Sequence, residues 1–383
     1  MKGGFAIVAR DFWPDAAAIG DGLFQLACMN AQRGPSSVVS MSSRSDAELF
    51  EVSPDIGKLN YYRCKPLSDS SSSLMKRIFE LFYFSLFVVT SLIRVRPAVV
   101  YCATNPPILV PFLVFLYAKI FGGKYIYHIQ DMHPESASLV LDLPKFLTSI
   151  ATSLDNIVLK NASVILTISD EMKASIADRQ VVEREILTIE NPALVTQVDH
   201  AAKMEGLVFC GNAGRLQLMD EVLSAVEKYY EQGGALKIAF VGGGVFKEKI
   251  RALDENQPNF SYFGKVSGKE ALEITARYTW GLLPIEPRVL RFGFPSKVPT
   301  YLSAGCRLFC VTDVNSSLAR WINEGDLGVV MMPIVGEIIR GFFDLEGQAL
   351  GDRLPKERLF LSSEGFARKL DEYVVEVLEG TGL

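Results

Sequence analysis

A short segment in the second half of the chain combines groups that suit a phosphate ligand. Pro295, Ser296 and Lys297 stand eight to ten residues before Gly305. Proline and serine are common where a helix begins and glycine where it ends, so the spacing predicts a helix whose first turn carries a lysine. Free backbone N–H groups, a hydroxyl and an ammonium together favour binding of a diphosphate. An ordinary helix cap with a solvated lysine is the alternative interpretation, and this segment alone leaves both open.

Three glycine-rich turns follow predicted strands in the same half of the chain. They are Gly211-Asn212-Ala213-Gly214, Gly242-Gly243-Gly244 and Phe263-Gly264. Glycine lets backbone N–H groups approach a phosphate closely. None of the three has the spacing of a dinucleotide fingerprint or a Walker A loop, and a single turn of this kind is weak support. Three at successive strand ends favour a nucleotide site.

These turns belong to an alternation of strands and helices that runs through the chain. It predicts strands at 5–9, 37–40, 98–102, 124–128, 164–167 and 186–189, and then at 206–210, 236–241, 260–263, 281–284, 307–312 and 328–331. Such alternation predicts parallel sheets covered by helices on both faces, with ligands at the carboxyl ends of the strands. We expect two domains, 1–195 and 205–362, with a linker at about 193–205 and a cleft between them. A last helix within 363–383 either stands apart or returns to the first domain.

Composition narrows the class of protein. The 383 residues carry a net charge of −5, which argues against a nucleic-acid binder. The six cysteines include no CxxC pair, a pattern that suits a reducing cytoplasm, and no signal peptide is expected at the start of the chain. His128 and His133 flank Asp131 without an evident third ligand, so no metal site is expected.

The segment from 74 to 120 is the most apolar part of the sequence. The predicted helix 74–95 has basic flanks and an aromatic stripe, Phe79, Phe82, Phe84 and Phe87, which we expect to be mostly core. Asn105-Pro106-Pro107 interrupts the next apolar run, so a strand, a turn and a helix are expected there in place of a membrane span. Peripheral contact of helix 74–95 with a membrane surface is the favoured interpretation.

The chain as a whole resembles the family-4 glycosyltransferases of the GT-B fold, which have two Rossmann-like domains facing a cleft. Four segments carry the resemblance to the bacterial branch that builds surface polysaccharides, often from UDP-linked N-acetylated amino sugars: Phe12-Trp13-Pro14-Asp15, Asp131-Met132-His133-Pro134-Glu135-Ser136, Gly211-Asn212-Ala213-Gly214, and Pro295-Ser296-Lys297 with Tyr301-Leu302 and Gly305. The resemblance implies a retaining, metal-independent transferase. It uses no cofactor beyond its nucleotide-sugar substrate and acts on a glycan or lipid-linked acceptor at the cytoplasmic face of the membrane.

The same resemblance implies roles for individual residues. Asp131, Glu135 and Asp15 are the candidates for orienting or deprotonating the acceptor. The remaining candidates would bind the donor: Gly20, Gly211, Asn212, Gly214, Arg215, Gly242, Gly243, Gly264, Lys265, Pro295, Ser296, Lys297, Thr300 and Tyr301.

Several positions depart from the family pattern. The usual Arg and Lys of the second domain are replaced by Asn212 and Gln217, and the paired glutamates by Phe292 and Thr300. The glycine pair of the first loop is replaced by Ala16-Ala17-Ala18. Two alternatives therefore stay open: a UDP-sugar epimerase on the same fold, and a partner subunit that does not catalyse.

Overall fold

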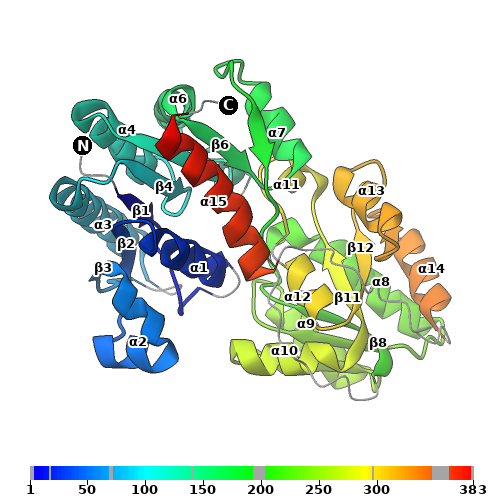
Figure 1. The fold of residues 1–383 in the computed structure, drawn as a ribbon. Helices are drawn as coiled ribbons and strands as arrows, with labels where there is room; N and C mark the ends of the chain where they lie inside the picture. Colours follow the sequence, from blue (N-terminus) through cyan, green and yellow to red (C-terminus); the bar gives the residue numbers. More distant parts are fainter. Residues whose placement is uncertain are drawn as a thin grey trace. The chain divides into compact units, whose positions relative to one another are not determined.

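The computed structural model describes residues 4–16, 19–68, 72–139, 141–192, 203–295, 297–346 and 362–380. The chain divides into two compact units, unit 1 (Met1–Ala193 with Leu361–Leu383) and unit 2 (Leu194–Phe360). Each unit is built on one parallel sheet flanked by helices, which confirms the predicted α/β fold (Figure 1). Most of the predicted linker, 193–202, lies outside the described residues, as do Ala17, Ala18 and Ser296.

Within the described residues, unit 1 has a seven-stranded sheet in the order β3-β2-β1-β4-β5-β6-β7. Its strands are β1 (Phe5–Val8), β2 (Ser36–Met41), β3 (Asn60–Cys64), β4 (Val99–Ala103), β5 (Lys124–Ile129), β6 (Val164–Thr167) and β7 (Ile186–Thr188). Every pairing is parallel. The chain moves outward from β1 in one direction and from β4 in the other, so the loops after these two strands diverge. Ligands of doubly wound sheets bind at this switch point.

Helices cover both faces of this sheet. They are α1 (Ile19–Ala31), α2 (Asp46–Val52), α3 (Leu74–Val95), α4 (Leu109–Phe121), α5 (Glu135–Ser138), α6 (Lys145–Asn161), α7 (Asp170–Ala177) and α15 (Ser363–Glu379). The sequence left open whether the last helix stands apart or returns to the first domain. In the structure this helix, α15, packs on α1 within unit 1 (Figure 1). Buried Asp371 of α15 fixes this contact, because its carboxylate accepts hydrogen bonds from Arg33 at 2.5 and 2.6 Å and from Asn30 at 3.0 Å.

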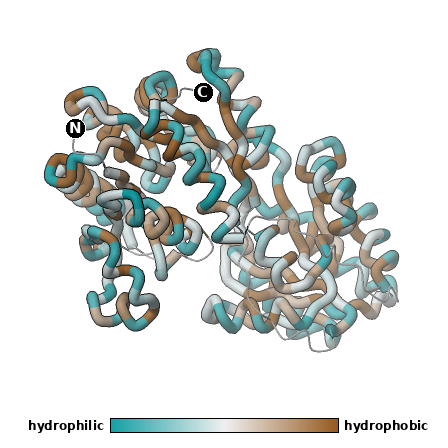
Figure 2. The backbone as a smooth tube through the Cα atoms, in the orientation of Figure 1, coloured by the Kyte–Doolittle hydropathy of each residue, from teal (hydrophilic) through white to brown (hydrophobic). Residues whose placement is uncertain are grey.

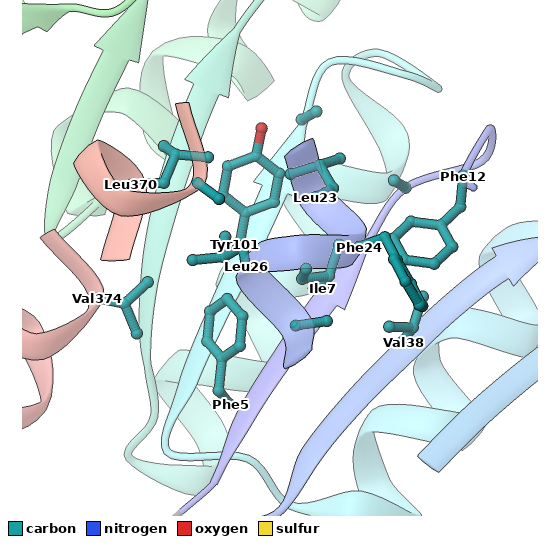
Figure 3. Packing of buried hydrophobic residues seen from close by; sticks show 14 of the residues in the cluster. Phe5, Ile7, Phe12, Leu23, Phe24, Leu26, Val38, Tyr101, Leu370 and Val374 are labelled. Carbon is teal, nitrogen blue, oxygen red and sulfur yellow. The ribbon is translucent and has the colours of Figure 1, made fainter. Parts of the chain in front are cut away.

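One buried hydrophobic cluster of unit 1 lies between α1, α15 and the sheet. Figure 3 shows Leu26 of α1 and Leu370 of α15 packed around Tyr101, which extends from β4. Tyr101 is fully buried, and its hydroxyl lies 2.6 Å from His128 Nδ1. Along the tube of Figure 2 the strands are mostly hydrophobic, whereas α15 alternates between hydrophilic and hydrophobic residues, as expected for a helix that covers a core on one side.

The helix α3 spans 22 residues. Among the described residues it is the one helix long and apolar enough to cross a membrane by length and composition. It also connects β3 to β4, and Phe84, Val88 and Leu92 on it are completely buried. The prediction that its phenylalanine stripe is mostly core is wrong for Phe79 and Phe82, which are 64% and 62% exposed. Their side chains point outward because residues three and four apart share one face of a helix.

Unit 2 has, among its described residues, a six-stranded parallel sheet in the order β10-β9-β8-β11-β12-β13. The strands are β8 (Met204–Cys210), β9 (Lys237–Val241), β10 (Phe260–Gly264), β11 (Tyr278–Pro284), β12 (Arg307–Val311) and β13 (Gly328–Met331). Its helices are α8 (Met219–Glu231), α9 (Lys247–Asn256), α10 (Gly268–Ala276), α11 (Pro287–Leu290), α12 (Lys297–Ser303), α13 (Ser317–Glu324) and α14 (Val335–Leu345). The switch point of this sheet lies between β8 and β11.

Candidate functional site

The three glycine turns of unit 2 form one continuous backbone surface at the carboxyl ends of β8, β9 and β10. Gly211 N–H donates to Val241 at 2.8 Å, and Ala213 N–H donates to Gly243 at 2.7 Å. Gly242 N–H donates to Gly264 at 2.7 Å. Each turn is therefore held by the next, and the predicted clustering of these glycines is found in the structure.

Glycine is required at several of these positions. Gly211, Gly242 and Gly244 have φ of 135°, 128° and 138°, which residues with a Cβ rarely adopt. A Cβ on Gly242 would collide with the carbonyl oxygen of Gly211, and one on Gly244 with that of Ala213. Gly243 differs, because a Cβ there would meet nothing within 4 Å.

Lys297 lies against this surface at the switch point. A Cβ on Gly211 would stand 2.6 Å from Lys297 Cε, so the absence of a side chain at Gly211 makes room for the lysine. The Lys297 ammonium is 5.2 Å from the ring centroid of Phe209, a buried residue of β8. Among the described residues, no carboxylate forms an ion pair with it.

Burial lowers the pKa of the Lys297 ammonium. Removing a cation from water without a counter-charge is unfavourable, and an anion bound beside it would offset that cost. Groups with such perturbed pKa values are common at functional sites. The helix α12 has only seven residues, so we assign the positive charge of this site to Lys297 and the N–H groups of the turns, without a contribution from the helix dipole.

Tyr301 has a different position from the one predicted. It is fully buried, its hydroxyl accepts from Cys210 N–H at 2.8 Å, and it donates to the carbonyl of Leu282 at 3.0 Å. These two partners belong to β8 and β11, the strands on either side of the switch point. The predicted donor contact is therefore wrong for this side chain in the structure, because Tyr301 supports the site from beneath.

The other predicted donor residues lie around the same strand ends, except for Gly20 in unit 1. Gly264 ends β10 and Lys265 is exposed beside it, whereas Pro295 and Thr300 flank Lys297 in sequence. Asn212 is exposed on the first turn, and Arg215 begins a 3-10 helix, Arg215–Gln217. Gly20 is buried in α1, where a Cβ would lie 3.1 Å from Trp13 N.

Gln217 has a structural role that the sequence did not predict. Its Oε1 accepts from Gly214 N–H at 2.8 Å and so closes the first glycine turn. The position at which the family usually has lysine thus carries a residue that fixes the backbone here. Its amide gives no cation at this position, whereas Lys297 approaches the first turn at Gly211.

In unit 1, Asp131 follows β5 at the carboxyl edge of the sheet. Its N–H and that of Gln130 donate to Thr104 Oγ1 at 3.2 and 3.1 Å. Thr104 is a buried residue directly after β4. Its place at the end of a strand is the one sequence feature that could have predicted its contact with the segment at Asp131. No hydrogen bond or ion pair from another described residue reaches the Asp131 carboxylate. Although this side chain is accessible to water, the surrounding protein restricts its hydration and raises its pKa to about 6.

Glu135 and Asp15 already have cationic partners. Glu135 pairs with Arg179 at 2.8 Å, and Arg179 also pairs with buried Asp155 at 2.5 Å. Asp15 accepts from Arg44 at 2.6 Å and from Ser42 at 2.8 Å. Arg179 lies far from Glu135 in sequence, so no spacing rule could have connected them. Of the three predicted acidic residues, Asp131 is the one whose carboxylate forms no hydrogen bond or ion pair with another described residue.

Metal ligation has no support in the part of the chain that the structure describes. No group of three or more His, Cys, Asp or Glu side chains there is placed to hold an ion. His128 is fully buried in the core, with Nδ1 beside Tyr101, and burial lowers its pKa to about 3. His133 lies 3.3 Å from Ser136 Oγ.

The backbone geometry of the glycine turns predicts how alanine substitutions there affect the stability of unit 2. Replacing Gly211 or Gly242 by alanine should destabilise unit 2 by about 1–2 kcal/mol or more, because a Cβ is strained at positive φ and collides with Lys297 or the Gly211 carbonyl. Gly243→Ala is the matched control and should leave the unfolding midpoint nearly unchanged. Urea unfolding of the three variants measures this, and equal effects at all three positions would contradict the geometry.

Comparisons with known proteins agree with this arrangement. No family model matches the chain. A protein of Pseudomonas aeruginosa named "Probable glycosyltransferase WbjE" is 24% identical over 282 residues, which cover 69% of this chain and 70% of that relative. This similarity extends over most of both sequences.

Solved structures share the fold over nearly the whole chain. A glycosyltransferase of Rickettsia africae is 13% identical, with 99% of this chain and 97% of that chain covered and a TM-score of 0.59. HepE of Anabaena, in complex with UDP, is 12% identical with coverages of 99% and 98% and a TM-score of 0.58. The UDP-GlcNAc 2-epimerase of Methanocaldococcus jannaschii is 10% identical with coverages of 97% and 99% and a TM-score of 0.57. At such low identities, these structures show that the fold is shared, but they do not show that the activity is shared.

The two doubly wound sheets and the similarity to WbjE lead to the same conclusion. The chain has the GT-B fold and is similar over most of its length to a probable glycosyltransferase.

Proposed function

We propose that this protein is a family-4 glycosyltransferase that transfers a sugar from a UDP-sugar, with retention of configuration, to a polyprenyl-diphosphate-linked glycan at the cytoplasmic face of the membrane. The observation that carries the donor half of this proposal is the Lys297 ammonium. It lies half-buried against Gly211, where burial lowers its pKa, and it has no carboxylate partner among the described residues. A diphosphate supplies the negative charge that this cation lacks.

The donor would bind to unit 2 through a small set of contacts. Lys297 contacts the diphosphate, and the turn at Gly211–Gly214 lies beside it. The turns at Gly242–Gly244 and Gly264 surround the nucleoside. In the transition state the leaving diphosphate gains charge, and a cation already placed there stabilises it without further reorganisation. This positive charge supports a reaction that proceeds without a metal ion.

The choice of UDP and of an amino sugar rests on relatives. The resemblance to the branch that uses UDP-linked N-acetylated amino sugars suggests both, and the UDP complex of HepE supports the base. Retention of configuration rests on the family resemblance alone.

Asp131 is the proposed residue for orienting and deprotonating the acceptor hydroxyl. A carboxylate of raised pKa is a stronger base than an ordinary one, and Asp131 is not engaged by a cation. Glu135, tied to Arg179, is proposed to position the segment that carries Asp131.

Membrane association is part of the proposal because α3 exposes a row of large apolar side chains. Met75, Phe79, Phe82 and Leu86 are 75%, 64%, 62% and 66% exposed. Lys76 and Arg94 lie near the two ends of this helix. An apolar row with basic flanks is typical of a helix that lies in the membrane interface.

An epimerase is the second candidate, favoured by the structural likeness to the UDP-GlcNAc 2-epimerase. A panel of UDP-, GDP- and dTDP-sugars, scored for nucleotide release with and without acceptor, separates the candidates. Release of UDP that depends on acceptor supports the transferase. A new sugar formed from donor alone supports the epimerase, and no thermal stabilisation by any nucleoside diphosphate supports a subunit without catalytic activity.

The Lys297→Ala variant tests the donor site itself. Loss of a charge-assisted contact of about 1.5–3 kcal/mol should raise the Kd for UDP at least about tenfold. Lys269→Ala is the matched control, because the Lys269 side chain is 88% exposed on α10. Isothermal titration of UDP measures both variants. An unchanged Kd in Lys297→Ala would show that the diphosphate binds elsewhere.

The raised pKa of Asp131 predicts how kcat/KM for the acceptor depends on pH. Because its pKa is about 6, Asp131 is ionised above that pH and protonated below it. The protonated form cannot accept a proton, so kcat/KM for the acceptor should rise with pH through about 6 and level off above it. Asp131→Asn should lower the rate and remove this inflection, whereas Asp15→Asn should keep it. An inflection that persists in Asp131→Asn would assign the titration to another group.

A further inference from the structure

The helix α4 of unit 1 is apolar on every side. Its polar groups are Lys119 near its end and the hydroxyl of Tyr117, which donates to the Pro97 carbonyl at 3.0 Å. A helix that is apolar all round is normally enclosed, either in a protein core or in a membrane. Only one side of α4 is buried in this structure. The opposite side is a row of partly or fully exposed apolar residues: Leu109, Leu113, Leu116 and Ile120.

Two neighbouring helices continue this apolar surface. The helix α4 packs on α3 along one side and on α6 along the other (Figure 1). Each of the three returns the chain from the carboxyl end of one parallel strand to the amino end of a later one, so they run in the same direction. The outward row of α6 consists of Phe146, Ile150 and Ile157, which are 64%, 55% and 39% exposed. We call the exposed row of α3 described above, this row of α6 and the row of α4 between them the three-helix face.

The side of each helix opposite its exposed row is buried. Phe84 and Val88 of α3, Val114 of α4 and Leu159 of α6 are buried on that side. Residues three and four apart share one side of a helix, so each exposed row is continuous along its helix. The three rows therefore form one surface that is not covered by another described part of unit 1.

The ionised residues exposed on these helices are all basic. The acidic residues of the three helices are Glu80 and Asp155, which are buried and paired with Arg10 at 2.7 Å and with Arg179 at 2.5 Å. The nearest exposed carboxylate in sequence is Asp142, in the loop before α6. Because the whole chain has a net charge of −5, positive charge here is a local feature. The exposed basic residues include Lys76, Arg94, Lys119, Lys145 and Lys160.

This charge pattern selects between two occupants of the three-helix face. Apolar rows beside basic residues match an anionic lipid surface, where the apolar side chains enter the interface and the cations meet lipid headgroups. A second copy of the chain that used the same face would bring like charges together, because a two-fold interface places one surface against itself. The observed distribution of charge therefore favours lipid.

We propose that the whole three-helix face, with α4 at its centre, lies in the interface of a membrane that contains anionic lipid. This inference rests on the membrane association in the proposed function, which invoked α3 alone. It adds α4 and α6 to the contact, and it adds negative charge as the property of the lipid that is recognised.

Vesicle flotation of the full chain tests the inference without any nucleotide-sugar. The protein is mixed with phosphatidylcholine vesicles prepared with or without phosphatidylglycerol. Each basic residue near an anionic surface strengthens binding about fivefold, so phosphatidylglycerol should increase the bound fraction at least about tenfold at low salt. Added salt should reverse most of this increase, since it screens the charges.

Matched variants test the two added helices. Ile120→Ser on α4 and Ile150→Ser on α6 should each lower partitioning into the anionic vesicles about tenfold, because an apolar side chain then no longer enters the interface. Ile334→Ser in unit 2 is the control, since Ile334 is 56% exposed and Ile150 is 55% exposed.

A second pair of variants tests the charge. Lys145→Gln on α6 should lower binding about fivefold, and only to the anionic vesicles. Lys269→Gln, which removes an exposed charge from α10 of unit 2, should leave binding unchanged. Unchanged thermal unfolding of each variant shows that it is folded.

Three results would overturn the inference. Wild-type partitioning of both Ile120→Ser and Ile150→Ser would restrict the contact to α3. Equal binding with and without phosphatidylglycerol would show that lipid charge is not recognised. A dimer in analytical ultracentrifugation that Ile150→Ser dissociates would assign the face to a second copy. Failure of the proposed glycosyl transfer is distinguishable, because it would appear as absent UDP binding and absent nucleotide release while vesicle binding persists.

Discussion

The close approach of Lys297 to Gly211 is the contact on which the candidate donor site depends. A lysine side chain can lie across the end of β8 only because Gly211 has no Cβ, and Gly211 can adopt its φ of 135° for the same reason. The turn is then held by hydrogen bonds to the two turns beside it. Tyr301 adds a bridge beneath, from Cys210 to Leu282, across the two strands that diverge there. The result is a cation fixed against a surface of backbone amides.

Unit 1 uses the corresponding place in its sheet differently. Arg10 follows β1 much as Gly211 follows β8, but its guanidinium is joined to buried Glu80 on α3. That pair fixes a long helix to the sheet, and the same helix exposes its apolar row to the surroundings. The helix α3 therefore has both a polar contact with the loop after β1 and an exposed apolar row.

The sequence was sufficient for the features that follow from local rules. The glycine turns, the helix that starts after Pro295 and the break at Asn105–Pro107 are all found, because each depends on residues close in the chain. The strand β3 and the helices α2, α7, α13 and α14 were not predicted, although Ile338, Phe342 and Leu345 of α14 are buried at regular helical spacing. The contacts of Glu135 with Arg179, of Asp371 with Arg33 and of Gly214 with Gln217 depend on tertiary structure or exact turn geometry. Tyr301 was assigned to the donor because burial cannot be inferred from a motif.

The central claim is that Lys297 and the glycine turns of unit 2 hold the diphosphate of the donor, and a structure of the protein with UDP bound tests it most directly. The account predicts a phosphate oxygen within hydrogen-bonding distance of Lys297 Nζ and of a backbone N–H in the turn at 211–214. A UDP molecule whose diphosphate lies away from Lys297, with that ammonium unchanged in its place beside Phe209, would contradict it.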